Sequence, residues 1–291
     1  MATPELLASC WTHAGDAAPM RGDERSPFDI LDRVAAVGAA GWAGIGFVHA
    51  DLVVARDTIG YPALRSAIAD AGIRHTEVEF LGDWWDTGDA RAASDAIRTD
   101  LLEAIEALGA RTIKAAGKMW AAPDEVDLDV MRTEFDALAT QVGARGARIA
   151  LEALPFTNFA TIGAGSDFVA SVGNPSGGLC VDLWHVYRGG NTPEDLRADV
   201  DPAVLFAVEL NDALEPAPAD LWADTINERR LPGEGSWDVP GFINVIRDLG
   251  FAGPWGVEIL ATTHRAKSLH DEVTSAFAAT ITQFALADSA R

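Results

Sequence analysis

Several features that would indicate other classes of protein are scarce in this 291-residue sequence. Basic residues are few, with 22 Lys and Arg against 44 Asp and Glu, so the formal net charge is −22. Proteins that bind nucleic acids usually carry a basic surface, because neutralised phosphates supply most of their affinity. The acidic balance therefore argues against a nucleic-acid partner and is most simply explained as a solvated surface.

Cysteine is also rare, and long hydrophobic runs are missing. Only Cys10 and Cys180 occur, far apart and without CxxC or Cys/His ligand spacing, so we expect both to be small buried residues. Nowhere do 18 apolar residues follow one another, which predicts no membrane span. The first residues lack a basic stretch followed by an apolar run, so we expect no export signal and a cytoplasmic protein.

Short apolar runs alternate with helical patterns along the whole chain. The runs that we expect to be strands are Leu6–Trp11, Gly44–Phe47, His75–Phe80, Thr112–Ala115, Arg148–Leu154, Gly178–Leu183, Leu205–Leu210 and Trp255–Leu260. Between them, apolar residues recur at the i, i+3, i+4 and i+7 spacing of amphipathic helices. Eight strand–helix units without a break in composition predict an α/β fold, a (β/α)8 TIM barrel that forms a single domain over residues 1–291.

Glycines and one serine mark the expected helix ends. Five expected helices close with a glycine, which accepts the left-handed C-cap conformation, at Gly41, Gly72, Gly109, Gly146 and Gly250. Ser26 followed by Pro27 predicts a helix start. The longest loop is expected from Ala213 to about Gly235. A doubly wound open sheet is the alternative fold, but the first expected strand is not followed by a GxGxxG turn.

Acidic residues stand at the ends of four consecutive apolar strands. In a parallel barrel, the functional residues lie at the C-terminal ends of the strands, and here those ends carry Glu152, Asp182, Glu209 and Glu258. Burying one unpaired carboxylate costs on the order of several kcal/mol, so four of them need a common partner. Because hard divalent ions prefer oxygen ligands, the sequence predicts one metal site built from these four residues. Glu79, on the third expected strand, is interpreted as a helix cap or an arginine partner.

The order of several short motifs resembles the xylose-isomerase-like TIM-barrel superfamily of sugar isomerases and epimerases. The matching segments are Ala150-Leu151-Glu152, Val181-Asp182-Leu183-Trp184-His185, Val208-Glu209-Leu210-Asn211-Asp212, Arg229-Arg230-Leu231-Pro232-Gly233-Glu234-Gly235 and Gly256-Val257-Glu258. The resemblance covers nearly the whole chain. It implies that Glu152, Asp182 and Glu258 bind a metal ion. It also implies that His185 and Arg229 contact substrate oxygens.

The seventh expected strand departs from the pattern of the family. Relatives commonly have Val-His-x-x-Asp there, whereas this chain has Val208-Glu209-Leu210-Asn211-Asp212. Glu209 would then replace a neutral imidazole ligand by a carboxylate. A cage of four carboxylates favours Mn²⁺ or Mg²⁺ over zinc, which prefers nitrogen and sulfur ligands.

The resemblance implies enolate chemistry on a small polyhydroxylated carbonyl substrate. A divalent ion would stabilise the enediolate, while Glu152 and Glu258 act as the catalytic pair that removes and returns a proton. Lys114 is a further substrate-binding candidate that could hold an anionic group. Trp184 is another, because apolar sugar faces pack well on indoles. The expected activity is that of a sugar isomerase or epimerase.

Other functions stay open at this point. If the enolate expels a β-hydroxyl group, the same residues would give a lyase of the inosose or 3-dehydroshikimate dehydratase kind. A non-catalytic sugar-binding barrel is disfavoured, because a mere binder has no use for four acids in its cavity. An endonuclease IV role is disfavoured by the acidic balance and by the lack of that enzyme's larger set of histidine ligands. Barrels of this family often pair through exposed helices and loops, so a homo-oligomer is a further expectation.

Overall fold

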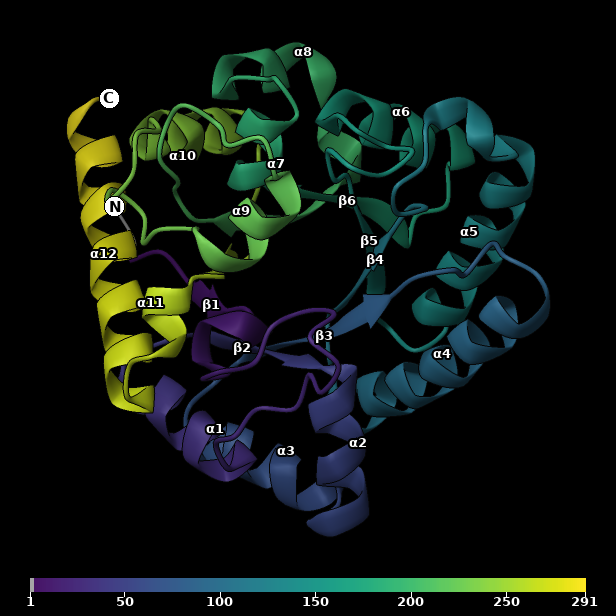
Figure 1. Cartoon of the computed structure of the whole chain (residues 1–291). Coiled ribbons are helices and arrows are strands. Elements are labelled where there is room, and N and C mark those ends of the chain that lie inside the picture. The colour runs from purple at the N-terminus through teal and green to yellow at the C-terminus, as the bar shows by residue number, and fades with distance from the viewer. Residues whose placement is uncertain (1–2) are drawn as a thin grey trace.

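The computed structural model describes residues 3–291, and their strands close into one parallel barrel (Figure 1). The strands follow one another around the barrel in chain order: β1 (Leu6–Ala8), β2 (Gly44–Val48), β3 (His75–Leu81), β4 (Thr112–Ala116), β5 (Arg148–Glu152), β6 (Gly177–Asp182), β7 (Leu205–Leu210) and β8 (Trp255–Val257). All neighbouring strands are parallel, and β8 pairs with β1 to complete the ring. The predicted (β/α)8 barrel is confirmed.

Helices surround the barrel and connect consecutive strands. The α-helices are α1 (Ile30–Ala39), α2 (His49–Thr58), α3 (Tyr61–Asp70), α4 (Gly88–Leu108), α5 (Leu128–Gly143), α6 (Ile162–Val172), α7 (Leu183–Arg188), α8 (Leu196–Asp199), α9 (Leu221–Asn227), α10 (Val239–Asp248), α11 (Thr262–Arg265) and α12 (Leu269–Ser289). Short 3-10 helices are η1 (Cys10–His13), η2 (Pro123–Glu125), η3 (Pro193–Asp195) and η4 (Pro202–Val204). The C-terminal helix α12 contacts α1 and α10, so it closes the outer ring.

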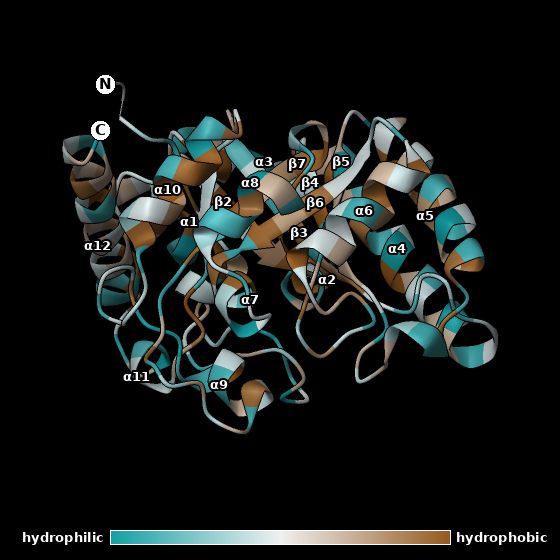
Figure 2. Ribbon diagram, turned by 90° about the horizontal axis from the view of Figure 1, so that it is seen from above, coloured by the Kyte–Doolittle hydropathy of each residue, from teal (hydrophilic) through white to brown (hydrophobic). Residues whose placement is uncertain are grey.

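Apolar side chains fill the barrel and the layer between strands and helices. A parallel strand is covered on both faces, so its residues are buried almost without alternation. Strands β2, β4, β6 and β7 are buried at every position. In Figure 2 the hydrophobic colour gathers on the central strands, and the hydrophilic colour lies mainly toward the outside. Across residues 3–291, no helix is both long and apolar enough to cross a bilayer.

The predicted glycine caps are confirmed, whereas the predicted start of the first helix is wrong. All five glycines have positive φ: Gly41 (94°), Gly72 (73°), Gly109 (68°), Gly146 (75°) and Gly250 (83°). Helix α1 begins only at Ile30, because the Asp29 side chain accepts hydrogen bonds from the first backbone amides of the helix. Ser26 Oγ accepts a hydrogen bond from the amide of Phe28 and lies in the preceding turn.

Three strands, β1, β5 and β8, are shorter than their apolar runs predict, and β5 ends at Glu152 instead of Leu154. β1 ends at Ala8, and the rest of that run is the buried helix η1. β8 ends at Val257, although the next residues of the run are also buried. The loop expected from Ala213 to about Gly235 contains helix α9, which is capped by the side chain of Asp220. Apolar character therefore marked burial correctly at these places but not the backbone conformation.

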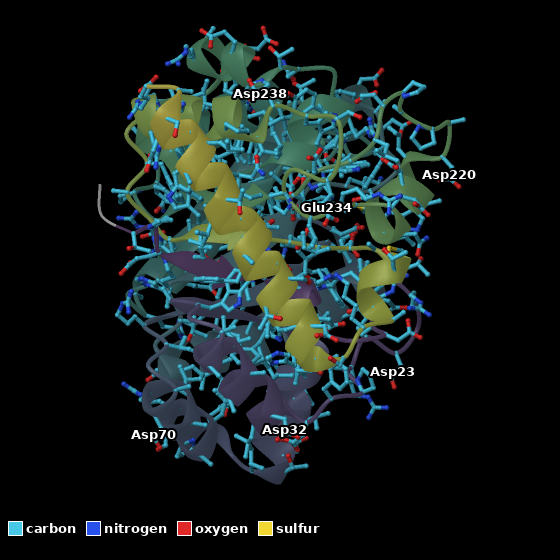
Figure 3. All side chains as sticks on the ribbon, turned by 90° about the vertical axis from the view of Figure 1, so that its left-hand side faces the viewer. Asp23, Asp32, Asp70, Asp220, Glu234 and Asp238 are labelled. Carbon is cyan, nitrogen blue, oxygen red and sulfur yellow. The ribbon has the colours of Figure 1, made fainter. Side chains whose placement is uncertain are left out.

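Many acidic side chains lie on the outer surface, spread over its different parts. Figure 3 labels six of them, all exposed: Asp23, Asp32, Asp70, Asp220, Glu234 and Asp238. Their wide spacing is consistent with the predicted solvated surface. A smaller group of carboxylates is buried instead, and four of its members stand at the C-terminal ends of β5 to β8.

Candidate functional site

Four buried carboxylates converge at the C-terminal ends of β5 to β8. Glu152 is the last residue of β5, Asp182 is the last of β6, and Glu258 directly follows β8. Glu209 in β7 pairs in register with Asp182, so its side chain starts from the same level of the barrel. Each of the four offers a ligand oxygen, and these oxygens lie within 4.8 Å of one another. The structure therefore brings together all four predicted metal ligands.

The Lys114 side chain reaches this cluster from β4. Its Nζ lies 2.6 Å from Glu209 Oε1, 3.0 Å from Glu79 Oε2 and 3.6 Å from Glu258 Oε1. Burial by itself would lower the pKa of Lys114, but the facing carboxylates raise it well above the usual value. The lysine is thus a buried permanent cation. Glu79, which we expected to be a helix cap or an arginine partner, pairs with this lysine.

Arg229 neutralises the opposite side of the cluster. Its Nη1 lies 2.8 Å from Asp182 Oδ2 and 3.0 Å from Glu258 Oε2. Its Nε and Nη2 donate to Thr225, and only 1% of the residue is exposed. Burial opposes ionisation of Asp182, yet the Arg229 guanidinium and His185 lower the pKa of that carboxyl. All three nitrogens of the guanidinium are therefore engaged within the protein.

His185 is held against the Glu152 carboxylate. The Asp182 side chain caps α7 by accepting hydrogen bonds from the backbone amides of Trp184 and His185, which fixes the position of the histidine. His185 Nε2 lies 2.8 Å from Glu152 Oε1, while its Nδ1 is buried without a hydrogen-bond partner. Although burial opposes it, the hydrogen bond from His185 lowers the pKa of Glu152. Glu152 is thus kept ionised at the end of β5.

The charges of the site fit a divalent cation. Five buried carboxylates (Glu79, Glu152, Asp182, Glu209, Glu258) face two permanent cations, Lys114 and Arg229. Burial raises the pKa of Glu258 to about 7, and burial together with the Glu258 carboxylate raises the pKa of Glu209 well above its usual value. The five carboxylates outnumber the two cations, so negative charge stays uncompensated when all five are ionised. Oxygen donors with such an excess suit a hard divalent ion.

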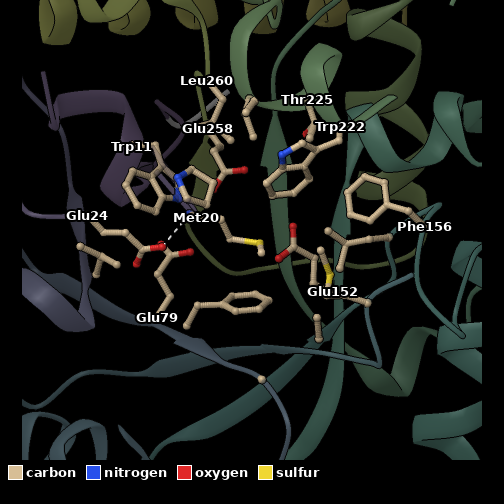
Figure 4. Close-up of a pocket in the computed structure, with 18 of the residues that line it drawn as sticks. Trp11, Met20, Glu24, Glu79, Glu152, Phe156, Trp222, Thr225, Glu258 and Leu260 are labelled. Atoms are coloured by element: carbon tan, nitrogen blue, oxygen red, sulfur yellow. Dashed lines mark hydrogen bonds between the residues drawn. The ribbon is translucent and has the colours of Figure 1, made fainter. Parts of the chain in front are cut away.

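Three of these carboxylates, Glu79, Glu152 and Glu258, line the floor of a cavity of about 370 Å³ (Figure 4). Asp182 and Glu209 are buried outside the set of described residues that line it. Glu152 and Glu258 approach the cavity from different sides, with their carboxyl groups turned toward each other. Apolar side chains make much of the wall, including Trp11, Phe156 and Trp222. Such a cavity, with a few convergent polar groups in an apolar wall, is the usual form of a small-molecule site.

The predicted substrate-binding residues occupy two different positions. His185 and Arg229 line the cavity, together with the predicted catalytic pair Glu152 and Glu258. Lys114 is fully buried among the carboxylates, outside the set of described residues that line the cavity. Trp184 is also fully buried, and its indole Nε1 donates to Asp224 Oδ2 at 3.0 Å. The roles of these residues toward a substrate stay predictions.

Several residues of the wall were not found from the sequence. Phe156 and Met119 lie in the loops that follow β5 and β4, and Trp222 lies in α9. The only available signal was the aromatic residue itself, since the segment around Trp222 was expected to be a loop. Trp11, in η1 after β1, also lines the cavity.

Comparisons with known proteins agree with this architecture. Over 242 residues, or 81% of this chain, it is 26% identical to a 3-dehydroshikimate dehydratase of Pseudomonas putida, of which it covers 37%. Over 134 residues, or 45% of this chain, it is 25% identical to an inosose isomerase of Halalkalibacterium halodurans, of which it covers 46%. The chain thus spans less than half of each of these relatives.

A solved structure of the IolI protein with a bound zinc atom shares the fold. It superposes with a TM-score of 0.78 at 16% identity, covering 97% of this chain and 98% of that chain. The sequence profile of the xylose isomerase-like TIM barrel matches residues 32–276. Because this match takes in most of the barrel and all four strand-end carboxylates, the chain belongs to the xylose isomerase-like TIM-barrel family.

Proposed function

We propose that this protein is a divalent-metal-dependent isomerase or epimerase of a small polyhydroxylated carbonyl compound. The observation that carries the proposal is the convergence of four carboxylate oxygens within 4.8 Å of one another, two of which belong to residues that line a cavity, Glu152 and Glu258. The names of the relatives, an isomerase and a dehydratase, are consistent with enzymatic chemistry of this kind. The match of the family profile supports it further.

In this proposal Glu152, Asp182, Glu209 and Glu258 would hold the ion. When bound, such an ion supplies charge stabilisation for an enediolate and helps to orient the substrate. The donors are carboxylates, to which His185 could add one nitrogen. Since oxygen donors suit Mn²⁺ and Mg²⁺ better than zinc, we propose one of these two ions, although the IolI structure contains zinc.

Proton transfer is assigned to Glu152 and Glu258. Their carboxyl groups face each other across the cavity floor, so one can remove a proton beside the carbonyl and the other can return one. His185 orients Glu152 through the 2.8 Å contact, and its unpartnered Nδ1 adds a polar atom to the site. Arg229 holds Glu258 and Asp182 in place, and its buried guanidinium supplies positive charge at the floor.

The decisive experiment combines metal analysis with a substrate screen. Elemental analysis of the purified protein should detect about one divalent ion per chain. Ketoses, inososes and 3-dehydroshikimate are then incubated with and without chelator, and isomers are separated by chromatography. We expect isomerisation or epimerisation that stops with chelator and returns with Mn²⁺. An aromatic absorbance from 3-dehydroshikimate would show instead that the dehydratase alternative is correct.

Matched variants complete this test. Glu152→Gln keeps the size of the side chain but removes its charge, so it should abolish turnover and weaken metal binding. Glu228→Gln changes an exposed acid outside the cavity and should leave both unchanged. A protein that binds a sugar equally well in both forms and never turns it over would be the non-catalytic barrel. We also propose that residues 1–291 form one domain, which limited proteolysis tests.

A further inference from the structure

The cavity has two chemically different ends. Its floor is ionic, with Glu152, Glu258 and Arg229, whereas the wall nearer its mouth carries Phe156 and Trp222 (Figure 4). A polyhydroxylated ring needs hydrogen-bonding partners around its edge, and the carboxylate floor can supply them. The aromatic wall supplies few polar atoms, so it suits a part of the ligand that has no hydroxyl groups.

Phe156 and Trp222 of this wall pack against a third ring, Trp120, which lies outside the set of described residues that line the cavity, and we call the three rings the aromatic rim. Their centroids are separated by 5.1 Å (Trp120–Phe156), 5.5 Å (Trp120–Trp222) and 5.6 Å (Phe156–Trp222). Trp120 is 58% exposed, and the other two are half-buried. Exposed aromatic clusters at the mouth of a cavity are typical of binding surfaces rather than of the folding core.

The aromatic rim is held in place by the loops that carry it. The amide of Trp120 donates to the carbonyl of Phe156 at 2.7 Å, and an antiparallel bridge joins Met119 to Thr157. The loops after β4 and β5 are therefore linked to each other. Trp222 comes from α9, whose first turn is capped by Asp220. Such fixed rings bind an apolar group without the entropic cost of ordering a loose loop.

The charges of the lining disfavour an anionic ligand. Among the described residues that line the cavity, Arg229 is the only arginine or lysine, and its nitrogens are engaged by Asp182, Glu258 and Thr225. His49 also lines the cavity, but its Nε2 contacts Asp100 at 2.8 Å. Recognition of a phosphate or carboxylate by side chains needs a cation that is available to it. Apart from the metal ion of the proposed function, the described residues of the lining offer no such cation.

Two further acids stand at the mouth. Glu24 and Asp83 line the cavity beyond the floor carboxylates, and Asp83 is exposed. Negative charges at the entrance raise the local potential against an incoming anion and slow its association. A neutral compound meets no such barrier.

We infer that the ligand is a neutral compound in which a polyhydroxylated carbonyl part carries a flat apolar substituent, such as an aromatic ring. The hydroxylated part lies on the carboxylate floor, and the substituent lies against Trp222 and Phe156. Carboxylated and phosphorylated sugars are disfavoured, because Arg229 of the lining is already engaged by Asp182 and Glu258. This inference rests on the proposed function, since it extends the substrate of the same site.

Binding of matched inosose derivatives tests the apolar part. The Mn²⁺-loaded protein is titrated with the mono-O-methyl and the mono-O-benzyl ether of scyllo-inosose, by calorimetry and by tryptophan fluorescence. We expect the benzyl ether to bind at least about tenfold more tightly. Trp222→Ala should abolish this preference without weakening the methyl ether, and Trp222→Phe should retain most of it. Leu286→Ala, on the exposed side of α12, is the matched control with no effect.

A second comparison tests the charge. Unsubstituted scyllo-inosose and 3-dehydroshikimate are both cyclic carbonyl compounds, but only the second carries a carboxylate. We expect the inosose to bind at least about tenfold more tightly. Equal affinity for the two ethers, an unchanged preference in Trp222→Ala, no binding of either ether, or tighter binding of 3-dehydroshikimate would overturn the inference.

Failure of the inference can be told apart from failure of the proposed function. The preference for the benzyl ether is a ratio of two affinities, and it does not require turnover. The proposed function depends on metal content and on turnover that stops with chelator. A benzyl preference in a protein without metal would refute only the proposed function, whereas metal-dependent turnover without the preference would refute only the inference.

Discussion

Replacing Lys114 by methionine tests the electrostatic account of the site most directly. The change keeps an unbranched side chain in place but removes the ammonium that lies 2.6 Å from Glu209 Oε1 and 3.0 Å from Glu79 Oε2. Removing one partner of a buried ion pair typically costs about 3 to 5 kcal/mol, because the other charge stays buried and uncompensated. For a chain of this size, that loss lowers the melting temperature by on the order of 10 °C.

The same change should strengthen metal binding. In the wild-type protein, the ammonium and the ion would share the Glu209 and Glu258 carboxylates, so the two cations repel each other. At an effective dielectric constant of about 20, two unit charges about 4 Å apart interact by about 4 kcal/mol, and the second charge of a divalent ion doubles this repulsion. Removing this repulsion strengthens metal binding, but part of the effect is offset because the carboxylates freed from Lys114 take up protons. We therefore expect Mn²⁺ to bind Lys114→Met at least about tenfold more tightly.

The assay is thermal unfolding in chelator and in Mn²⁺, together with calorimetric titration of the metal-free protein. Lys118→Met serves as the matched control. Among the described residues, Lys118 forms no ion pair with the four carboxylates, whereas Lys114 pairs with Glu209 and Glu258. The reasoning would be refuted if Lys114→Met melted within about 2 °C of the wild type in chelator. If Mn²⁺ raised the melting temperature of Lys114→Met no more than that of the wild type, the predicted increase in metal affinity would be contradicted.

Three further predictions concern other buried polar groups. Burial raises the pKa of Glu272 to about 8. The folded protein therefore keeps a proton that the unfolded chain releases above about pH 4.5. The free energy of unfolding should fall as the pH rises between these two values. Glu272→Gln should remove this slope and raise the free energy of unfolding at pH 8 by about 3 kcal/mol in urea titrations; an unchanged slope contradicts the assignment. Trp184→Phe removes the hydrogen bond to Asp224 and should lower the free energy of unfolding by about 1 kcal/mol in the same assay. We expect KM to stay nearly unchanged. A large rise in KM would instead support direct contact between Trp184 and the substrate. Asp212 accepts hydrogen bonds from the amides of Gly233, Gly235 and Trp237. Asp212→Ala should therefore lower the free energy of unfolding by about 2 to 4 kcal/mol and make the segment before α10 sensitive to proteolysis. A protease-resistant variant would show that other contacts hold this segment.

The sequence alone was sufficient to predict the barrel and to select the acidic residues at its strand ends. Parallel strands that are covered on both faces have apolar sequences. A left-handed glycine marks the end of a helix before the next strand, as at Gly109 and Gly250. An acid inside such a run is visible without coordinates, which is why Glu152, Asp182, Glu209 and Glu258 could be selected. These signals are local, because they depend on residues a few positions apart.

Only the tertiary structure decided what lies opposite those acids. Lys114 is 95 positions before Glu209, and closure of the barrel brings its ammonium to the far side of the same carboxylate. Glu79 enters the same group because β3 neighbours β4, with a register shift between these two strands. The aromatic rim likewise joins the loops after β4 and β5 to helix α9, and no local pattern encodes their contacts. Residue type and strand position could be read along the chain, whereas charge pairing and cavity shape arise from distances across the barrel, which exist only once it has closed.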